Sequence, residues 1–62
     1  MPTYSDVAAA DILGVPVRDV ILVREALQRA GIRVTHRGRI TEEGLTAIRE
    51  ALRLGNCSQQ HT

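Results

Sequence analysis

Glycine and proline residues divide this chain into short segments, which limits the elements that it can form. Gly14 precedes Val15-Pro16, where the residue before proline avoids helical backbone angles, and Gly31 and Gly38 break the chain again. Apolar residues recur at helical spacing between the breaks. The pattern predicts an all-α fold, a small three-helix domain of residues 1–55, followed by a disordered polar tail at 56–62.

The first predicted helix begins at a cap formed by Ser5 and ends before Gly14. Its buried face is predicted to contain Val7, Ala10 and Leu13. The second helix is predicted from about Pro16 to Ala30 and is ended by Gly31, with an apolar stripe of Val20, Val23, Leu27 and Ala30.

Two apolar side chains of this second helix, Ile21 and Leu22, lie off that stripe. A chain of 62 residues buries only about 60% of its unfolded surface, so it has little capacity to cover the excess. Either the first helix or a second copy of the chain covers these residues. We expect a homodimer with Ile21 and Leu22 at the interface.

The third predicted helix follows an extended connector at residues 32–35. Thr41 is suited to cap it, and Ile40 and Leu45 have the spacing of a hydrophobic staple. Gly55 is predicted to end it. The buried face would hold Leu45, Ile48 and Leu52, and the wet face Glu42, Thr46, Arg49 and Arg53.

Cysteine usage and hydropathy bear on location. Cys57 is the single cysteine, which excludes a disulfide scaffold and fits a reduced cytoplasm. No run is long and apolar enough to span a bilayer, and the first residues lack the pattern of a signal peptide. The expected location is the cytoplasm, without a membrane partner.

The net charge of +1 is unevenly distributed. Residues 1–23 contain three acids and one arginine, a balance of −2, whereas residues 24–62 contain seven arginines and four acids, a balance of +3. The single aromatic residue, Tyr4, makes a stacking platform for single-stranded nucleic acid an unfavoured interpretation. The basic half is therefore the candidate for contact with a polyanion.

Catalytic and metal-binding patterns are weak. His36 is a lone histidine, and Glu42 and Glu43 are adjacent residues that point in different directions on a helix. Cys57 and His61 lie four residues apart in the predicted tail, which does not make a zinc site. We expect no enzymatic activity, cofactor, metal or small-molecule substrate.

The basic half contains Arg37-Gly38-Arg39 between the second and third helices. Glycine lets the backbone approach another surface closely, and the arginines supply planar cations on long stems. The minor groove of A·T-rich DNA is a narrow, negative receptor for such a segment. The alternative for this short motif is a solvated turn.

A helix-turn-helix in the first half is a second candidate, since Ala10, Gly14, Val15, Val20 and Val23 fit its spacing. The outward residues near the start of its second helix would be Val17, Arg18, Ile21 and Leu22, which mostly lack hydrogen-bonding groups. We interpret these helices as a packing pair.

Residues 24–54 resemble the DNA-binding domain of the actinobacterial Lsr-type nucleoid-associated silencers. The shared pieces are an Arg-Glu helix ending at Gly31, the run Val34-Thr35-x-Arg37-Gly38-Arg39-Ile40, and a capped helix. H-NS-type silencers use a similar loop. The resemblance implies binding of double-stranded DNA in the A·T-rich minor groove, transcriptional regulation or nucleoid organisation, and a location at the nucleoid. Arg37, Gly38 and Arg39 would enter the groove, with Thr35 and His36 near the phosphates. We expect Arg33 to contact phosphate as well.

Two departures stand against this resemblance: Thr41 replaces the usual proline, and the separate oligomerisation domain is absent. The run Gly38-Arg39-Ile40-Thr41-Glu42-Glu43 also resembles the peripheral subunit-binding domains of 2-oxoacid dehydrogenase complexes. This second resemblance implies a protein-interaction module. It lacks the Gly-x-Gly run before the loop, and Gly44 replaces the usual aspartate.

Overall fold

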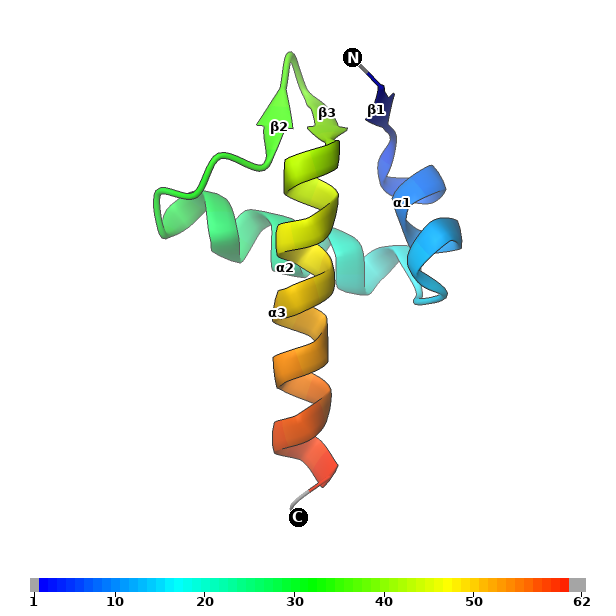
Figure 1. Ribbon diagram of the computed structural model, residues 1–62, viewed down its shortest axis with the longest axis vertical. Coiled ribbons are helices and arrows are strands. Elements are labelled where there is room, and N and C mark those ends of the chain that lie inside the picture. Colours follow the sequence, from blue (N-terminus) through cyan, green and yellow to red (C-terminus); the bar gives the residue numbers. More distant parts are fainter. Residues whose placement is uncertain (1, 61–62) are drawn as a thin grey trace.

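The computed structural model describes residues 2–60, and for residues 55–60 it describes the backbone alone. Three helices and three short strands make up this part of the chain (Figure 1). In chain order they are β1 (Thr3–Tyr4), α1 (Asp6–Leu13), α2 (Val17–Arg29), β2 (Thr35–His36), β3 (Arg39–Thr41) and α3 (Glu42–Gln60).

The fold is mostly helical, with the three predicted helices, but it is not purely all-α. The strands form an antiparallel sheet in the order β1-β3-β2. The predicted loop between the second and third helices is thus largely a β-hairpin. Strands of two or three residues are too short to show a clear alternation of apolar and polar side chains, which is the sequence signal for a strand.

Helix α1 begins and ends as its sequence predicts. The Ser5 hydroxyl accepts a hydrogen bond from the Ala8 amide at 3.1 Å, and Gly14 adopts a left-handed conformation with φ of 70°. The predicted buried face is wrong at Val7, whose side chain is 68% exposed. The prediction is confirmed at Ala10, which is buried, and Ala9 is buried in place of Val7. The small size of both alanines allows α1 to pack closely against its neighbours.

Helix α2 crosses behind α3 in Figure 1. Val20 is its buried residue, Val23 and Leu27 pack partly buried against the core, and Ala30, predicted as the end of the stripe, is exposed just beyond the helix. The Arg24 guanidinium pairs with the Asp6 carboxylate, with Nε to Oδ1 at 3.2 Å, and so ties α2 to the start of α1.

Helix α3 begins at the predicted cap, where the Gly44 amide donates to the Thr41 hydroxyl at 3.0 Å. Ile48 is buried, Leu45 and Leu52 are partly buried, and the four predicted wet residues are exposed. The predicted end at Gly55 is wrong, because the helical backbone continues to Gln60. A glycine inside a helix costs only about 1 kcal/mol relative to alanine, and no proline follows this one. Of the predicted tail, residues 61–62 lie outside the described residues.

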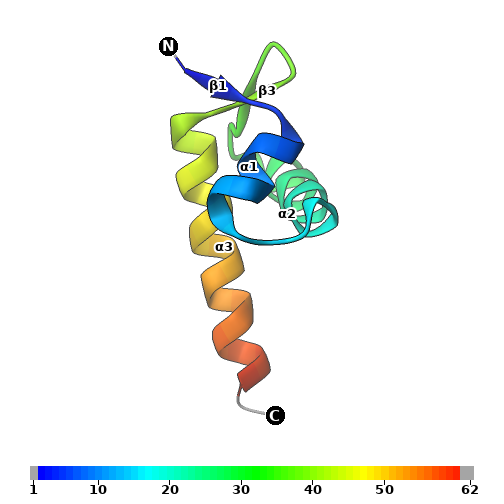
Figure 2. The ribbon, with the colours of Figure 1, turned by 90° about the vertical axis from the view of Figure 1, so that its right-hand side faces the viewer.

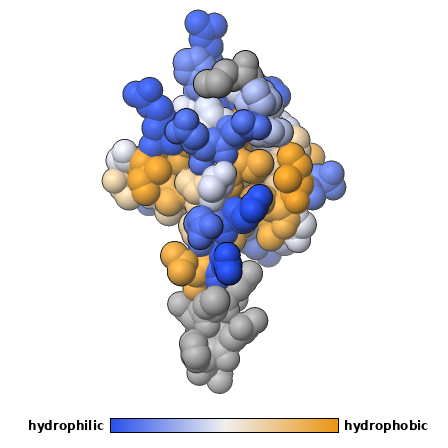
Figure 3. Space-filling model, viewed as in Figure 1, coloured by the Kyte–Doolittle hydropathy of each residue, from blue (hydrophilic) through white to orange (hydrophobic). Residues whose placement is uncertain are grey.

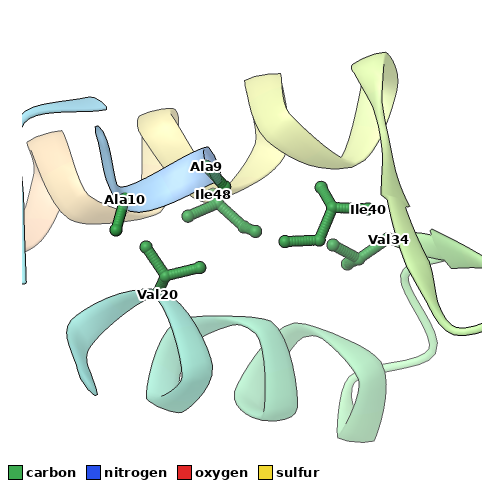
Figure 4. Packing of buried hydrophobic residues seen from close by; sticks show 6 residues of the cluster. All are labelled: Ala9, Ala10, Val20, Val34, Ile40 and Ile48. Carbon is green, nitrogen blue, oxygen red and sulfur yellow. The ribbon is translucent and has the colours of Figure 1, made fainter. Parts of the chain in front are cut away.

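The core joins all these elements. Figure 4 shows α2 across the core from α1 and α3, with Ala10 towards Val20 and Ala9 beside Ile48, while Ile40 and Val34 fill the end near the hairpin. Within the described part of the chain, no helix combines the length and the apolar character that a membrane crossing requires.

Candidate nucleic-acid interface

The predicted Arg-Gly-Arg segment lies at the end of a β-hairpin formed by β2 and β3. Thr35 is paired with Ile40 and His36 with Arg39, so that Arg37 and Gly38 are the two turn residues. We call these two residues the hairpin tip. The tip stands at the top of Figure 1, above the helices.

Both residues of the hairpin tip have a positive φ, 55° at Arg37 and 80° at Gly38. This combination is the requirement of a type I′ turn, whose twist matches that of the strands. Glycine accepts the conformation freely, but for arginine it costs roughly 1 kcal/mol, and asparagine is the usual residue at the first of these positions. Arg37 is the one non-glycine residue with positive φ within residues 2–60.

The cationic side chains at this end differ in their attachments. Arg37 is exposed and makes no hydrogen bond with the described residues. Arg39 is also exposed, but its Nε donates to the Thr3 hydroxyl at 3.0 Å, which fixes its stem against β1. The Arg37 side chain therefore has no hydrogen bond with the described residues, whereas the Arg39 side chain is held against β1.

The base of the hairpin is held by the carbonyl oxygen of Val34. It accepts hydrogen bonds from the Thr41 amide at 3.1 Å and from the Thr41 hydroxyl at 3.3 Å. The first turn of α3 passes so close to this carbonyl that a Cβ built on the buried Gly44 would lie 1.9 Å from the oxygen. Hairpin and helix are consequently joined backbone to backbone.

The other predicted DNA contacts are arranged around the same hairpin. Thr35 is half-buried, and its hydroxyl accepts a hydrogen bond from the Gln28 side chain at 3.0 Å. His36 and Arg33 are exposed. The sequence prediction had not included Gln28 or Thr3, whose contacts bridge 7 and 36 residues and leave no local sequence signal.

The predicted dimer residues on α2 are not equally accessible. Leu22 is 56% exposed, whereas Ile21 is half-buried. The exposed face of α2 around Leu22 also presents Arg18, Glu25 and Arg29. This face therefore offers more hydrogen-bonding side chains than the first turns of the helix alone. The pairing of α1 and α2 does form a packed contact, through Ala10 and Val20.

Figure 3 shows how polar and apolar side chains divide the visible face. The top of the molecule, where the hairpin lies, is hydrophilic, and hydrophobic residues lie on both sides of the polar front of α3. The hairpin end is therefore a polar, arginine-bearing surface. No protein-family model matches this sequence, and comparisons with curated proteins and with solved structures give no match either.

Proposed function

We propose that this protein binds double-stranded DNA by inserting the arginine side chains of its hairpin into the minor groove of A·T-rich sequence. The observation that carries the proposal is the placement of Arg37. This residue occupies a left-handed position where it reduces stability, and its exposed side chain has no partner among the described residues. Strain at an exposed residue whose side chain makes no hydrogen bond with the described residues supports a binding role.

The shape of the hairpin tip supports the same partner. Gly38 has no side chain, and a Cβ built on it would meet nothing within 4 Å, so that the tip is slender. The minor groove is about 6 Å wide and is narrower and more negative in A·T tracts. An arginine side chain fits this space, whereas a whole helix does not. Regulation of transcription or organisation of the nucleoid are the roles that such loosely specific binding would serve.

We expect wild-type protein to bind an A·T-rich duplex about tenfold or more tightly than a G·C-rich duplex of equal length, because the N2 amino group of guanine obstructs the minor groove. Fluorescence anisotropy titrations at several salt concentrations measure both affinities. The small number of cations predicts a salt dependence that corresponds to about 3–5 phosphates. Absence of binding even at low salt would contradict the proposal.

A protein-interaction module is the alternative function, and the same titration separates it from the first. A chain that binds neither duplex but retains its helical fold would favour a protein partner. The present surface favours DNA, because the exposed end of the hairpin is polar and carries arginines and no large apolar side chain.

We also propose that the protein pairs as a homodimer through α2. Leu22 lies between Arg18 and Glu25 on the exposed face, four residues after the first and three before the second. In an antiparallel pair related by a two-fold axis near Leu22, Arg18 of each copy meets Glu25 of the other. Two hairpins on one particle would then strengthen a weak single contact through effective concentration.

Replacing Leu22 by glutamine should weaken this dimer roughly tenfold or more, since burial of one leucine is worth about 1.5–3 kcal/mol. Sedimentation equilibrium at high micromolar concentration measures the change. Leu54→Gln is the matched control, because Leu54 is 67% exposed but lies on α3. Wild-type protein with a mass of 6.8 kDa under these conditions would show that it does not pair.

A further inference from the structure

The two sides of the hairpin carry opposite charges. Arg29 and Arg33 lie on the side of the edge strand β2, and both are exposed. They line two open hollows that share Gln28. One hollow is lined by Glu25, Gln28 and Arg29, and the other by Gln28, Gly31, Ile32, Arg33, Val34 and Thr35.

The other side begins where β3 leads into α3. The exposed residues of its first turn are Glu42 and Glu43, and the N-terminus of this helix is already capped by Thr41. Helices α2 and α3 lie on opposite sides of the domain below the hairpin in Figure 2. A phosphate chain close to the start of α3 would meet two carboxylates, whereas near the end of α2 it would meet two guanidinium groups and the single carboxylate of Glu25.

A polar network fixes the arginine side relative to the hairpin. Gln28 donates from Nε2 to the Thr35 hydroxyl at 3.0 Å and accepts from Arg24 Nη1 at 3.4 Å, and Arg24 is paired with Asp6. The end of α2 and strand β2 are thus joined by side chains. Arg29, one residue after Gln28, donates from Nε to the Glu25 carbonyl oxygen at 3.4 Å and lies at this joined end of α2.

We infer that the duplex lies across the α2 side of the hairpin, with Arg29 and Arg33 on the phosphates beside the minor groove that the hairpin tip enters. The inference rests on the proposed function and deepens it, since it assigns the DNA backbone to one face of the domain. Glu42 and Glu43 disfavour the opposite approach.

The test compares two double variants that change the net charge equally. Arg29→Gln with Arg33→Gln removes the inferred phosphate contacts, and Arg49→Gln with Arg53→Gln removes two exposed arginines of α3. The first pair should lower the affinity for an A·T-rich duplex about tenfold or more relative to the second. It should also reduce the slope of log K against log salt by roughly 1.8, since each phosphate contact contributes about 0.9.

A third variant tests the approach side directly. Glu42→Gln with Glu43→Gln should change the affinity less than about threefold if the duplex lies on the α2 side, and should raise it more than about tenfold if the duplex lies against α3. The second result, or equal affinities of the two arginine pairs, would overturn the inference. A failure of the proposed function gives a different result. In that case the wild-type protein does not bind the duplex, or it still binds when Arg37 and Arg39 are replaced.

Discussion

Gly44→Ala should destabilise the protein by about 3 kcal/mol or more, although alanine is the better helix former by about 1 kcal/mol. The added Cβ would lie 1.9 Å from the Val34 carbonyl oxygen and 2.7 Å from its carbon, so that backbone must move against backbone. That oxygen also accepts both hydrogen bonds from Thr41, so the movement weakens the base of the hairpin. A domain of this size has a total stability of only roughly 3–9 kcal/mol.

Urea unfolding followed by circular dichroism measures the loss. Thr46→Ala is the control on the same turns of α3, because Thr46 is exposed and its replacement should change stability by less than about 0.5 kcal/mol. Trimming the Val34 side chain should not rescue Gly44→Ala, since the closest atom belongs to the backbone. A Gly44→Ala protein within about 1 kcal/mol of wild type would contradict the close approach.

Replacing Arg37 and Arg39 together by alanine should lower the affinity for an A·T-rich duplex at least about 100-fold. Hydrogen bonds from charged groups contribute about 1.5–3 kcal/mol each, and two are lost. Helicity should remain, because neither side chain belongs to the core and alanine at position 37 tolerates a positive φ no worse than arginine. Anisotropy titration and circular dichroism on the same samples measure both quantities.

Arg37→Asn separates binding from folding more sharply. Asparagine is favoured in this turn, so that the variant should gain roughly 1 kcal/mol of stability while it loses affinity. Opposite changes in the two quantities exclude partial unfolding as the cause of weaker binding. Full affinity of the double alanine variant for the A·T-rich duplex would contradict the minor-groove proposal.

The helices could be predicted because their signals are local. The Ser5 and Thr41 caps each depend on a hydroxyl and an amide three residues later, and the left-handed Gly14 closes α1 within its own last turn. The sheet could not be predicted in this way. Strand β1 pairs Thr3 with Thr41, across most of the chain, and its two residues carry no periodic pattern.

It was harder to predict which residues of a helix face the core than where each helix begins and ends. Val7 has the correct spacing for a buried face, but Ala9 fills the core because the close approach of α1 needs a small side chain there. Gly44 was not predicted to have a packing role. Its importance comes from Val34, ten residues earlier, and no sequence rule places that carbonyl oxygen beside it.

The sequence predicted the residues of the candidate site, but it did not predict that a β-hairpin holds them. Arg37, Gly38 and Arg39 are exposed together at one end of the fold. A turn of Asn-Gly would have indicated a hairpin, and the arginine in place of asparagine hides that signal. The positions of Arg29 and Gln28 beside the hairpin depend on how the end of α2 packs against β2. That packing is a tertiary feature with no local sequence signal.

The pairing of β1 with β3 has a practical consequence for any polypeptide joined to this domain. A segment placed before Thr3 leaves the fold beside the hairpin, whereas a segment placed after α3 leaves at the opposite end of the long axis (Figure 1). If DNA binds as proposed, an affinity tag or fluorophore at the amino end would lie close to the hairpin and, if bulky, would obstruct the entry of the hairpin tip into the groove. Attachment behind α3 places the same cargo at the far end of the fold from the hairpin.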